Sequence, residues 1–148
     1  QLHHLHRHAH FSGASGGALA AAALAVDVNL DDIKEFAIAC AQHCHAHWSH
    51  AFRLRQYVVD CVDWVQQQEP RLASRANGRL HVAVTTLPFM RRRRYSHYRD
   101  DSHLRSVLLA SCCMSPLGGL PFMLDGALVF DGGITDFQPT LHAQAVTV

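Results

Sequence analysis

The chain lacks a dominant charge and a regular cysteine framework. Thirteen Lys and Arg residues against twelve Asp and Glu residues give a formal net charge of +1, which supplies no global field for nucleic acid. The five cysteines are an odd number at irregular spacings, which favours free thiols in a reducing compartment over structural disulfides. We therefore expect an intracellular, cytoplasmic protein with no nucleic-acid partner.

The sequence also lacks a segment that would cross a membrane. Its longest uncharged run, residues 11–26, consists largely of Ala and Gly and is too short and too weakly apolar to span a bilayer. The flank of this run is His-rich with one Arg, unlike the start of a secretory signal. The chain begins with Gln1 rather than Met, so we expect a fragment, a processed form or an excised domain.

The composition does suit one globular domain. The 148 residues are 49% hydrophobic and 17% charged, and a chain of this length can bury a substantial core. The first ten residues, QLHHLHRHAH, are strongly biased in composition, and we interpret residues 1–10 as a His-rich leader or a truncated strand. Residues 11–148 form the expected domain, in which no internal repeat is evident.

Helices and strands are predicted in alternation along this domain. A Gly-Ala-Ser turn leads into an alanine-rich helix, and capping residues, apolar stripes and a β-branched run mark the later elements. The predicted helices cover residues 16–25, 31–48, 53–68 and 101–112. The predicted strands cover residues 79–86 and the segment ALVFDGG, residues 127–133. This alternation favours an α/β fold with a mostly parallel central sheet covered by helices.

A pattern typical of a nucleophilic serine precedes the first helix. Gly13-Ala14-Ser15-Gly16-Gly17 fits G-x-S-x-G, in which small neighbours let the chain turn sharply and present the serine hydroxyl at the start of a helix. In a segment this rich in Ala and Gly, the same residues also fit a plain turn with Ser15 as the helix N-cap.

A carboxylate directly follows the apolar part of the last predicted strand. Asp131-Gly132-Gly133 comes directly after the apolar run ALVF, which places the carboxylate at the carboxyl end of a strand, with two glycines leaving it accessible. Open α/β sheets place their sites at such strand ends. Asp-Gly-Gly is by itself also a common turn sequence.

The two motifs together give the sequence a family resemblance. It resembles the patatin-like phospholipases, whose domains pair a G-x-S-x-G elbow with a downstream D-G-G and hydrolyse acyl esters with a Ser-Asp dyad. Ser15 and Asp131 stand 116 positions apart in the expected order. The segments NGRLHVAVTTLP (77–88), LLASCCMSPL (108–117) and DGALVFDGGITDFQP (125–139) are similar too, so the likeness covers almost the whole chain.

The resemblance implies a fold, a site and a substrate class. The fold is α/β, a three-layer α/β/α patatin-like arrangement with a mostly parallel central sheet, here expected to miss its first strand and glycine-rich oxyanion loop. Ser15 is the expected nucleophile, Asp131 the proton acceptor, and the backbone N–H of Gly16 the remaining oxyanion donor. The expected substrate is a lipid ester, met at a membrane or lipid-droplet surface, with no cofactor and no metal.

Two other kinds of site stay open at this stage. Ser15, Asp131 and His142 stand in the chain order of an α/β-hydrolase triad, in which His142 would be the base. The second alternative is a metal-binding module, because two cysteines and two histidines share one face of a predicted helix. Those four residues are Cys40, His43, Cys44 and His47. Packing or solvent-exposed roles suit them better, since four ligands from one straight helix rarely converge on one ion.

Two further segments have competing interpretations. The run Phe89 to Tyr95 (FMRRRRY) is expected to be a solvated connecting loop, with docking on an anionic lipid surface as the alternative. Cys112 and Cys113 end a predicted helix with no evident base beside them, so packing is preferred to a thiol nucleophile. For the whole domain, the alternative to an active enzyme is a catalytically inactive relative that binds lipid or acts as a scaffold.

Overall fold

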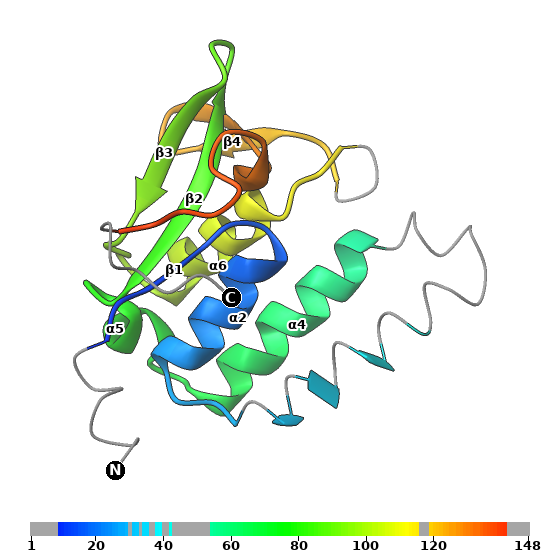
Figure 1. Cartoon of the computed structure of the whole chain (residues 1–148), viewed down its shortest axis with the longest axis vertical. Coiled ribbons are helices and arrows are strands. Elements are labelled where there is room, and N and C mark those ends of the chain that lie inside the picture. Colours follow the sequence, from blue (N-terminus) through cyan, green and yellow to red (C-terminus); the bar gives the residue numbers. More distant parts are fainter. Residues whose placement is uncertain are drawn as a thin grey trace.

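The computed structural model describes residues 9–29, 31–32, 34–35, 38–39, 42, 54–115 and 119–141. Figure 1 shows a sheet with helices packed against it. The strands are β1 (Phe11–Gly13), β2 (Leu80–Leu87), β3 (Arg91–Tyr95), β4 (Phe122–Leu124) and β5 (Ala127–Phe130). The helices are α2 (Gly16–Ala25), α4 (Leu54–Gln68), α5 (Leu72–Ala76), α6 (Asp101–Ser111) and the short 3-10 helix η3 (Gly132–Ile134).

Strand β2 is the centre of the sheet and pairs with three other strands. It pairs in parallel with β1 over residues 80–82, and antiparallel with β3 over residues 82–86 and with β5 over residues 85–87. The remaining strand, β4, forms a hairpin with β5. Because β3 occupies one edge of β2 over residues 82–86, β1 and β5 must share the other edge.

That shared edge has an opening which positions the site. β1 covers it up to Val82 and β5 covers it from Thr85, so Ala83 and Val84 have no strand partner on this side. β1 ends beside Val82, at one end of this opening, and a turn follows it. β5 ends beside Thr85, at the other end, and η3 follows it. Two segments that lie far apart in the sequence therefore meet over two residues of β2.

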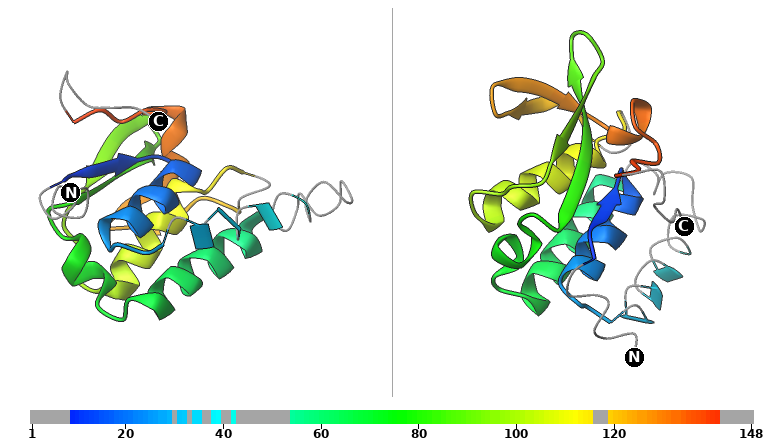
Figure 2. Two further views of the ribbon diagram at one scale, coloured as in Figure 1. Left: turned by 60° about the horizontal axis from the view of Figure 1, so that its bottom comes forward. Right: turned by 60° about the vertical axis from the view of Figure 1, so that its left-hand side comes forward.

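The helices stack in two layers on one side of the sheet. α2 and α6 pack against β2, and α4 packs on both of these helices (Figure 2). The buried residues of α2 are all alanines, whose small side chains let the helix lie close to the sheet. α4 directs Val62 and Val65 inward at helical spacing and exposes its polar residues.

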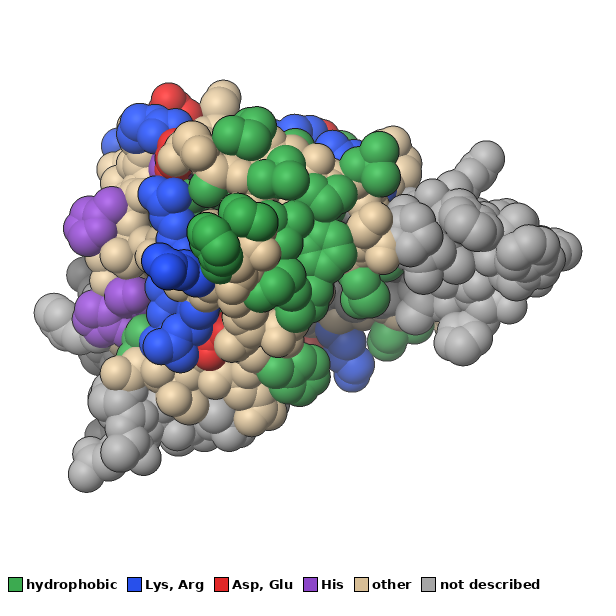
Figure 3. Space-filling model, turned by 90° about the horizontal axis from the view of Figure 1, so that it is seen from above, with side chains coloured by type: hydrophobic (Ala, Val, Ile, Leu, Met, Phe, Trp, Pro, Cys, Tyr) green, Lys and Arg blue, Asp and Glu red, His purple; other side chains and the backbone are tan. Residues whose placement is uncertain are grey.

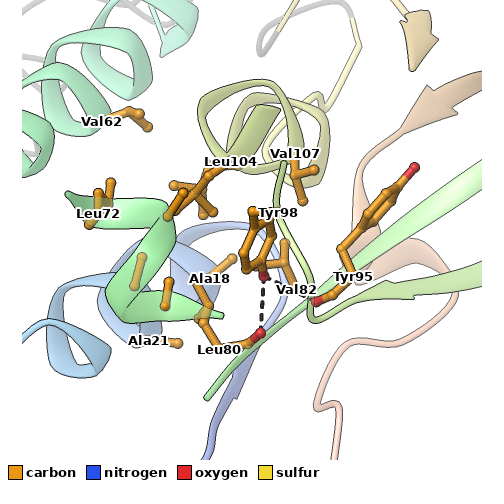
Figure 4. Close-up of a cluster of buried hydrophobic side chains, with 14 of the residues drawn as sticks. Ala18, Ala21, Val62, Leu72, Leu80, Val82, Tyr95, Tyr98, Leu104 and Val107 are labelled. Carbon is orange, nitrogen blue, oxygen red and sulfur yellow. Dashed lines mark hydrogen bonds between the residues drawn. The ribbon is translucent and has the colours of Figure 1, made fainter. Parts of the chain in front are cut away.

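One aromatic residue ties the core to the sheet. The buried side chain of Tyr98 lies among apolar residues of α6 and β2, and its hydroxyl reaches the carbonyl oxygens of Leu80 (3.0 Å) and Tyr95 (3.1 Å), as Figure 4 shows. Burial raises the pKa of Tyr98, which keeps the phenol neutral and able to donate. The segment between β3 and α6 is thereby fixed to the start of β2.

Most of the predicted elements are confirmed. The alanine-rich helix has the predicted bounds, and α4, α6 and β2 lie within a residue or two of the predicted ranges. β5 begins at the predicted residue but ends at Phe130, three residues before the predicted end. Helix α6 is capped by Asp100, whose carboxylate accepts the N–H of His103 at 2.7 Å. In the predicted helix 31–48, Asn29 accepts the N–H of Asp31 at 3.1 Å, and most later positions lie outside the described residues.

The α/β class is confirmed, but the sheet is mixed rather than mostly parallel. Of its four strand pairings in the described residues, one is parallel and three are antiparallel. The expected loop at the basic run was wrong, because Arg91–Tyr95 is strand β3. Successive side chains of a strand point to opposite faces of the sheet. Arg92 and Arg94 accordingly pair with Asp136 and Arg93 pairs with Asp125, so the charges of this strand have partners on both faces.

Besides β3, four elements were not predicted, namely β1, α5, β4 and η3, each of which has five residues or fewer. Such short elements carry too few residues for a period to be recognised. Of the expected leader, residues 1–8 lie outside the described part. In the described part of the chain, no helix is long and apolar enough to cross a membrane.

Candidate active site

The turn after β1 has the sharp geometry that an exposed nucleophile needs. Ser15 has φ 52° and ψ −130°, a positive-φ conformation that is costly for a residue with a Cβ and is typical of functional sites. At Gly13 a Cβ would overlap the backbone carbonyl of Gly17, so only glycine permits the close return of the chain. The turn is therefore closed by direct packing of Gly13 against the backbone of Gly17.

The hydroxyl of Ser15 points across the opening in the sheet rather than back to its own helix. Its side chain makes no capping hydrogen bond to α2, and Oγ donates to Oδ2 of Asp131 at 3.0 Å. The alternative of a plain N-cap serine is thus wrong. The two residues predicted from the sequence, 116 positions apart, are in direct hydrogen-bond contact.

Asp131 is held by its own loop and almost completely buried. The side chain caps η3, with Oδ1 accepting the N–H of Gly133 at 2.8 Å while Oδ2 receives the Ser15 hydroxyl. The residue is only 3% exposed. Burial raises the pKa of Asp131 above its ordinary value, and the hydrogen bonds from Gly133 and Ser15 offset part of that rise. A desolvated carboxylate of raised pKa is a stronger base towards an alcohol.

A second serine, which sequence reasoning missed, holds the backbone at the nucleophile. The hydroxyl of Ser111, at the end of α6, accepts the backbone N–H of Ser15 at 2.9 Å and donates to the carbonyl of Ala83 at 2.7 Å. Ser111 is fully buried. It therefore joins the nucleophile to the unpaired stretch of β2. The available signal was a lone hydroxyl within the apolar run LLASCC.

The Asp131 loop is fixed to β2 in a similar way. Thr85 donates from Oγ1 to the carbonyl of Asp131 at 2.6 Å and also contacts Oγ1 of Thr135 at 2.9 Å. A Cβ at Gly132 would overlap the carbonyl oxygen of Ala83, so the first glycine of the D-G-G motif is needed for close approach. The second, Gly133, serves instead through its N–H.

The start of α2 offers backbone donors beside Ser15. Gly16 and Gly17 are the first two residues of the helix and both are exposed. The N–H groups of a helix's first turn have no acceptor within the helix, and they carry the positive end of its dipole. The position predicted for an oxyanion donor, Gly16, therefore lies directly after the nucleophile, with open space around it.

The nearby thiols are structural. Cys112 and Cys113 are buried, and desolvation raises the pKa of each, which disfavours the reactive thiolate. The carbonyl of Cys113 accepts the N–H of Asp131 at 3.2 Å, and its Sγ contacts the carbonyl of Leu120 at 3.2 Å. The expectation that this pair packs rather than reacts agrees with both observations.

The competing sites lie mostly outside the described residues. This holds for His142 of the alternative triad and for Cys40, His43, Cys44 and His47 of the alternative metal module. Within the residues that the structure does describe, no group of three or more His, Cys, Asp or Glu side chains is arranged to hold a metal ion.

Comparison with known proteins agrees with this geometry at the level of the family. No curated protein matches the chain at the significance required. The family model of the patatin-like phospholipases matches residues 2–143, almost the entire sequence. The match includes β1, the turn with Ser15, and the D-G-G segment after β5. The chain therefore belongs to the patatin-like phospholipase family, whose kind of function is lipid acyl hydrolysis.

Proposed function

We propose that the protein is a serine acyl hydrolase that cleaves carboxylic esters of lipids, with Ser15 as nucleophile and Asp131 as general base. The observation that carries this proposal is the 3.0 Å contact from Ser15 Oγ to Asp131 Oδ2, made by a strained serine to a buried carboxylate. Strain at the nucleophile and burial of the base both oppose folding, so a purely structural pair would not explain them.

In the first step, Ser15 attacks the ester carbonyl as Asp131 takes its proton. The hydrogen bond sets the direction of this proton transfer before substrate arrives. Collapse of the tetrahedral intermediate breaks the bond to the alcohol, which leaves with the proton held by Asp131. The product at this stage is an acyl-enzyme on Ser15.

In the second step, a water molecule replaces the alcohol. Asp131 takes a proton from this water, which attacks the acyl carbonyl and releases the fatty acid, and the proton returns to Ser15. The same carboxylate thus acts once in each half-reaction, and no histidine is needed. In both steps, the negative oxygen develops next to the start of α2, where the N–H of Gly16 is the proposed donor.

The free thiols and the family suggest where this chemistry takes place. Cys112 and Cys113 are adjacent, buried thiols that form no disulfide, which suits a reducing compartment. We propose an intracellular, cytoplasmic enzyme that works at the surface of membranes or lipid droplets.

A hydrolysis assay with a water-soluble short-chain nitrophenyl ester tests the dyad without any lipid interface. Ser15→Ala should abolish hydrolysis, and Asp131→Asn, which keeps the side-chain shape, should lower kcat by roughly 10²- to 10⁴-fold. Ser106→Ala is the matched control, because this serine on α6 bonds only to the carbonyl of its own helix at Ser102. Equal activity of Asp131→Asn and the unaltered chain would contradict the assignment of the base.

A further inference from the structure

Several large apolar side chains are exposed on one face of the molecule. Figure 3, which looks down on the end where the β2–β3 turn lies, shows them gathered together with a band of Lys and Arg along one side. Phe89 at the turn is 75% exposed and Phe137 after η3 is 80% exposed. The apolar face, as we name it, comprises Phe89, Met90, Met114, Leu120, Met123, Leu128, Ile134 and Phe137.

The strand register accounts for the part of this face that lies on the sheet. Met123 is directly opposite Leu128, and Leu128 is directly opposite Leu87, so the three side chains form a row across β4, β5 and β2. The next residue pairs along these strands point to the other side, where Val129 is fully buried in the core. Both sides of this end of the sheet are therefore apolar, and one of them lacks cover in the described residues.

The same face adjoins the Ser-Asp pair. Ile134 and Phe137 belong to the loop that begins at Asp131, and a Cβ at Gly133 would lie 3.6 Å from the Phe137 ring. Met114 directly follows Cys113, whose carbonyl accepts the N–H of Asp131. Ile134 and Phe137 are three and six positions after Asp131 in the sequence, and Met114 is one position after Cys113. A lipid bound to the apolar face would therefore contact residues close to the proposed base.

The band beside the apolar face carries surplus positive charge. It consists of Arg91–Arg94 on β3 together with Arg99, and its carboxylate partners are Asp125 and Asp136. The five arginines outnumber these two carboxylates and Asp100, which lies next to Arg99, so the band keeps a surplus of positive charge. The guanidinium of Arg91 lies 5.5 Å from the centre of the Phe89 ring, so charge and apolar surface are in contact at the turn.

We propose that this face docks on the surface of an anionic phospholipid bilayer, with the β2–β3 turn inserted among the lipids and the arginine band against their phosphates. An exposed apolar patch of this extent marks an interaction surface, and the charge decides the occupant. An anionic bilayer offers acyl chains and negative charge together, whereas a second copy of the chain offers the same positive band. The biological meaning of the docking rests on the proposed function, since it brings Ser15 to its substrate.

Two substitutions separate the apolar and the electrostatic contributions. Arg91→Gln should weaken binding about fivefold, which corresponds to ~1 kcal/mol for one arginine near an anionic surface. Phe89→Ala should weaken it roughly tenfold through lost apolar burial. Arg71→Gln is the matched control for charge, because Arg71 is equally exposed but precedes α5 at the opposite end of β2 (Figure 1).

Vesicle sedimentation measures these effects directly. The 148-residue chain, carrying Ser15→Ala so that lipid is not consumed, is spun down with phosphatidylcholine vesicles that contain or lack phosphatidylserine. We expect binding to the anionic vesicles only, weakened by Arg91→Gln and by Phe89→Ala and unchanged by Arg71→Gln. Unfolding temperatures of the variants, which should agree within about 2 °C because both side chains are exposed, exclude misfolding as the cause.

The outcomes that overturn the docking are distinct from those that overturn the dyad. Equal binding to both kinds of vesicle, no binding, or binding that neither substitution alters would overturn the proposed surface. So would a concentration-dependent dimer that Phe89→Ala dissociates, since the occupant would then be a second copy. Hydrolysis of the soluble ester reports on Ser15 and Asp131 in each of these cases, because it needs no interface.

Discussion

Removal of the Ser111 hydroxyl should damage both the fold and the site. In Ser111→Ala, the N–H of Ser15 and the carbonyl of Ala83 both lose their partner; Ala83 is fully buried and Ser15 is partly buried. Each buried backbone group left without a hydrogen bond costs about 1–3 kcal/mol. The expected loss is therefore about 2–4 kcal/mol of unfolding free energy, which for a chain of this size lowers the unfolding temperature by roughly 5–15 °C.

The same substitution should slow catalysis by moving the nucleophile rather than by removing a reacting group. Ser15 depends on its N–H anchor to hold a strained backbone, and a misplacement of about 1 Å can cost roughly 10²-fold in rate. Ser111 is thus a positioning residue. Its loss should lower kcat for the soluble ester with a smaller effect on KM, because the Ser111 side chain is fully buried and does not contact the substrate.

Denaturant unfolding and ester hydrolysis test both expectations, with Ser106→Ala as control on the same helix. That variant should stay within about 0.5 kcal/mol of the unaltered chain, because its hydroxyl is exposed and bonds only within α6. If Ser111→Ala also lies within 0.5 kcal/mol and keeps full activity, the argument that Ser111 bridges the elbow to β2 is refuted.

Three further predictions concern the base and its loop. Because burial raises the pKa of Asp131, the rate of ester hydrolysis should fall with decreasing pH through a midpoint above the ordinary value of 3.8, a limb that Asp131→Asn should lack. The raised pKa also means that ionisation of Asp131 opposes folding, so the unfolding free energy should fall as pH rises from 3.8 through the folded pKa. Asp131→Asn should therefore unfold at a higher temperature than the unaltered chain at pH 7 and should lose this advantage below pH 3.8. Gly132→Ala places a Cβ on the Ala83 carbonyl and should cost about 1–3 kcal/mol or more, whereas Gly16→Ala meets nothing within 4 Å and should leave the unfolding temperature nearly unchanged.

The site could be predicted from the sequence to a large extent. G-x-S-x-G and D-G-G are local patterns whose glycines are needed for steric reasons, and at Gly13 and Gly132 those reasons are visible as backbone overlaps. What joins the motifs could not be predicted in this way. Ser111 and Thr85 act through long-range hydrogen bonds, and in the sequence each is one hydroxyl among apolar neighbours.

The fold shows the same division between local and long-range information. A short window of sequence reveals the run of alanines in α2 and the apolar stripes of α4 and α6, and these three helices were predicted closely. The mixed sheet was not, because strand pairing depends on tertiary contacts. The run Arg91–Arg94 lacks the β-branched and aromatic residues typical of strands. In the fold it pairs with β2, and its alternating side chains meet Asp125 and Asp136, which lie far away in the sequence.

Active-site labelling is the most direct test of the central claim. The folded chain is treated with a fluorophosphonate, which forms a covalent bond with an activated serine, and the modified peptide is located by mass spectrometry. The account predicts modification at Ser15, none in Ser15→Ala, and labelling slowed by at least 10²-fold in Asp131→Asn. Absence of labelling in the folded chain, or labelling at full rate without the Asp131 carboxylate, would contradict it.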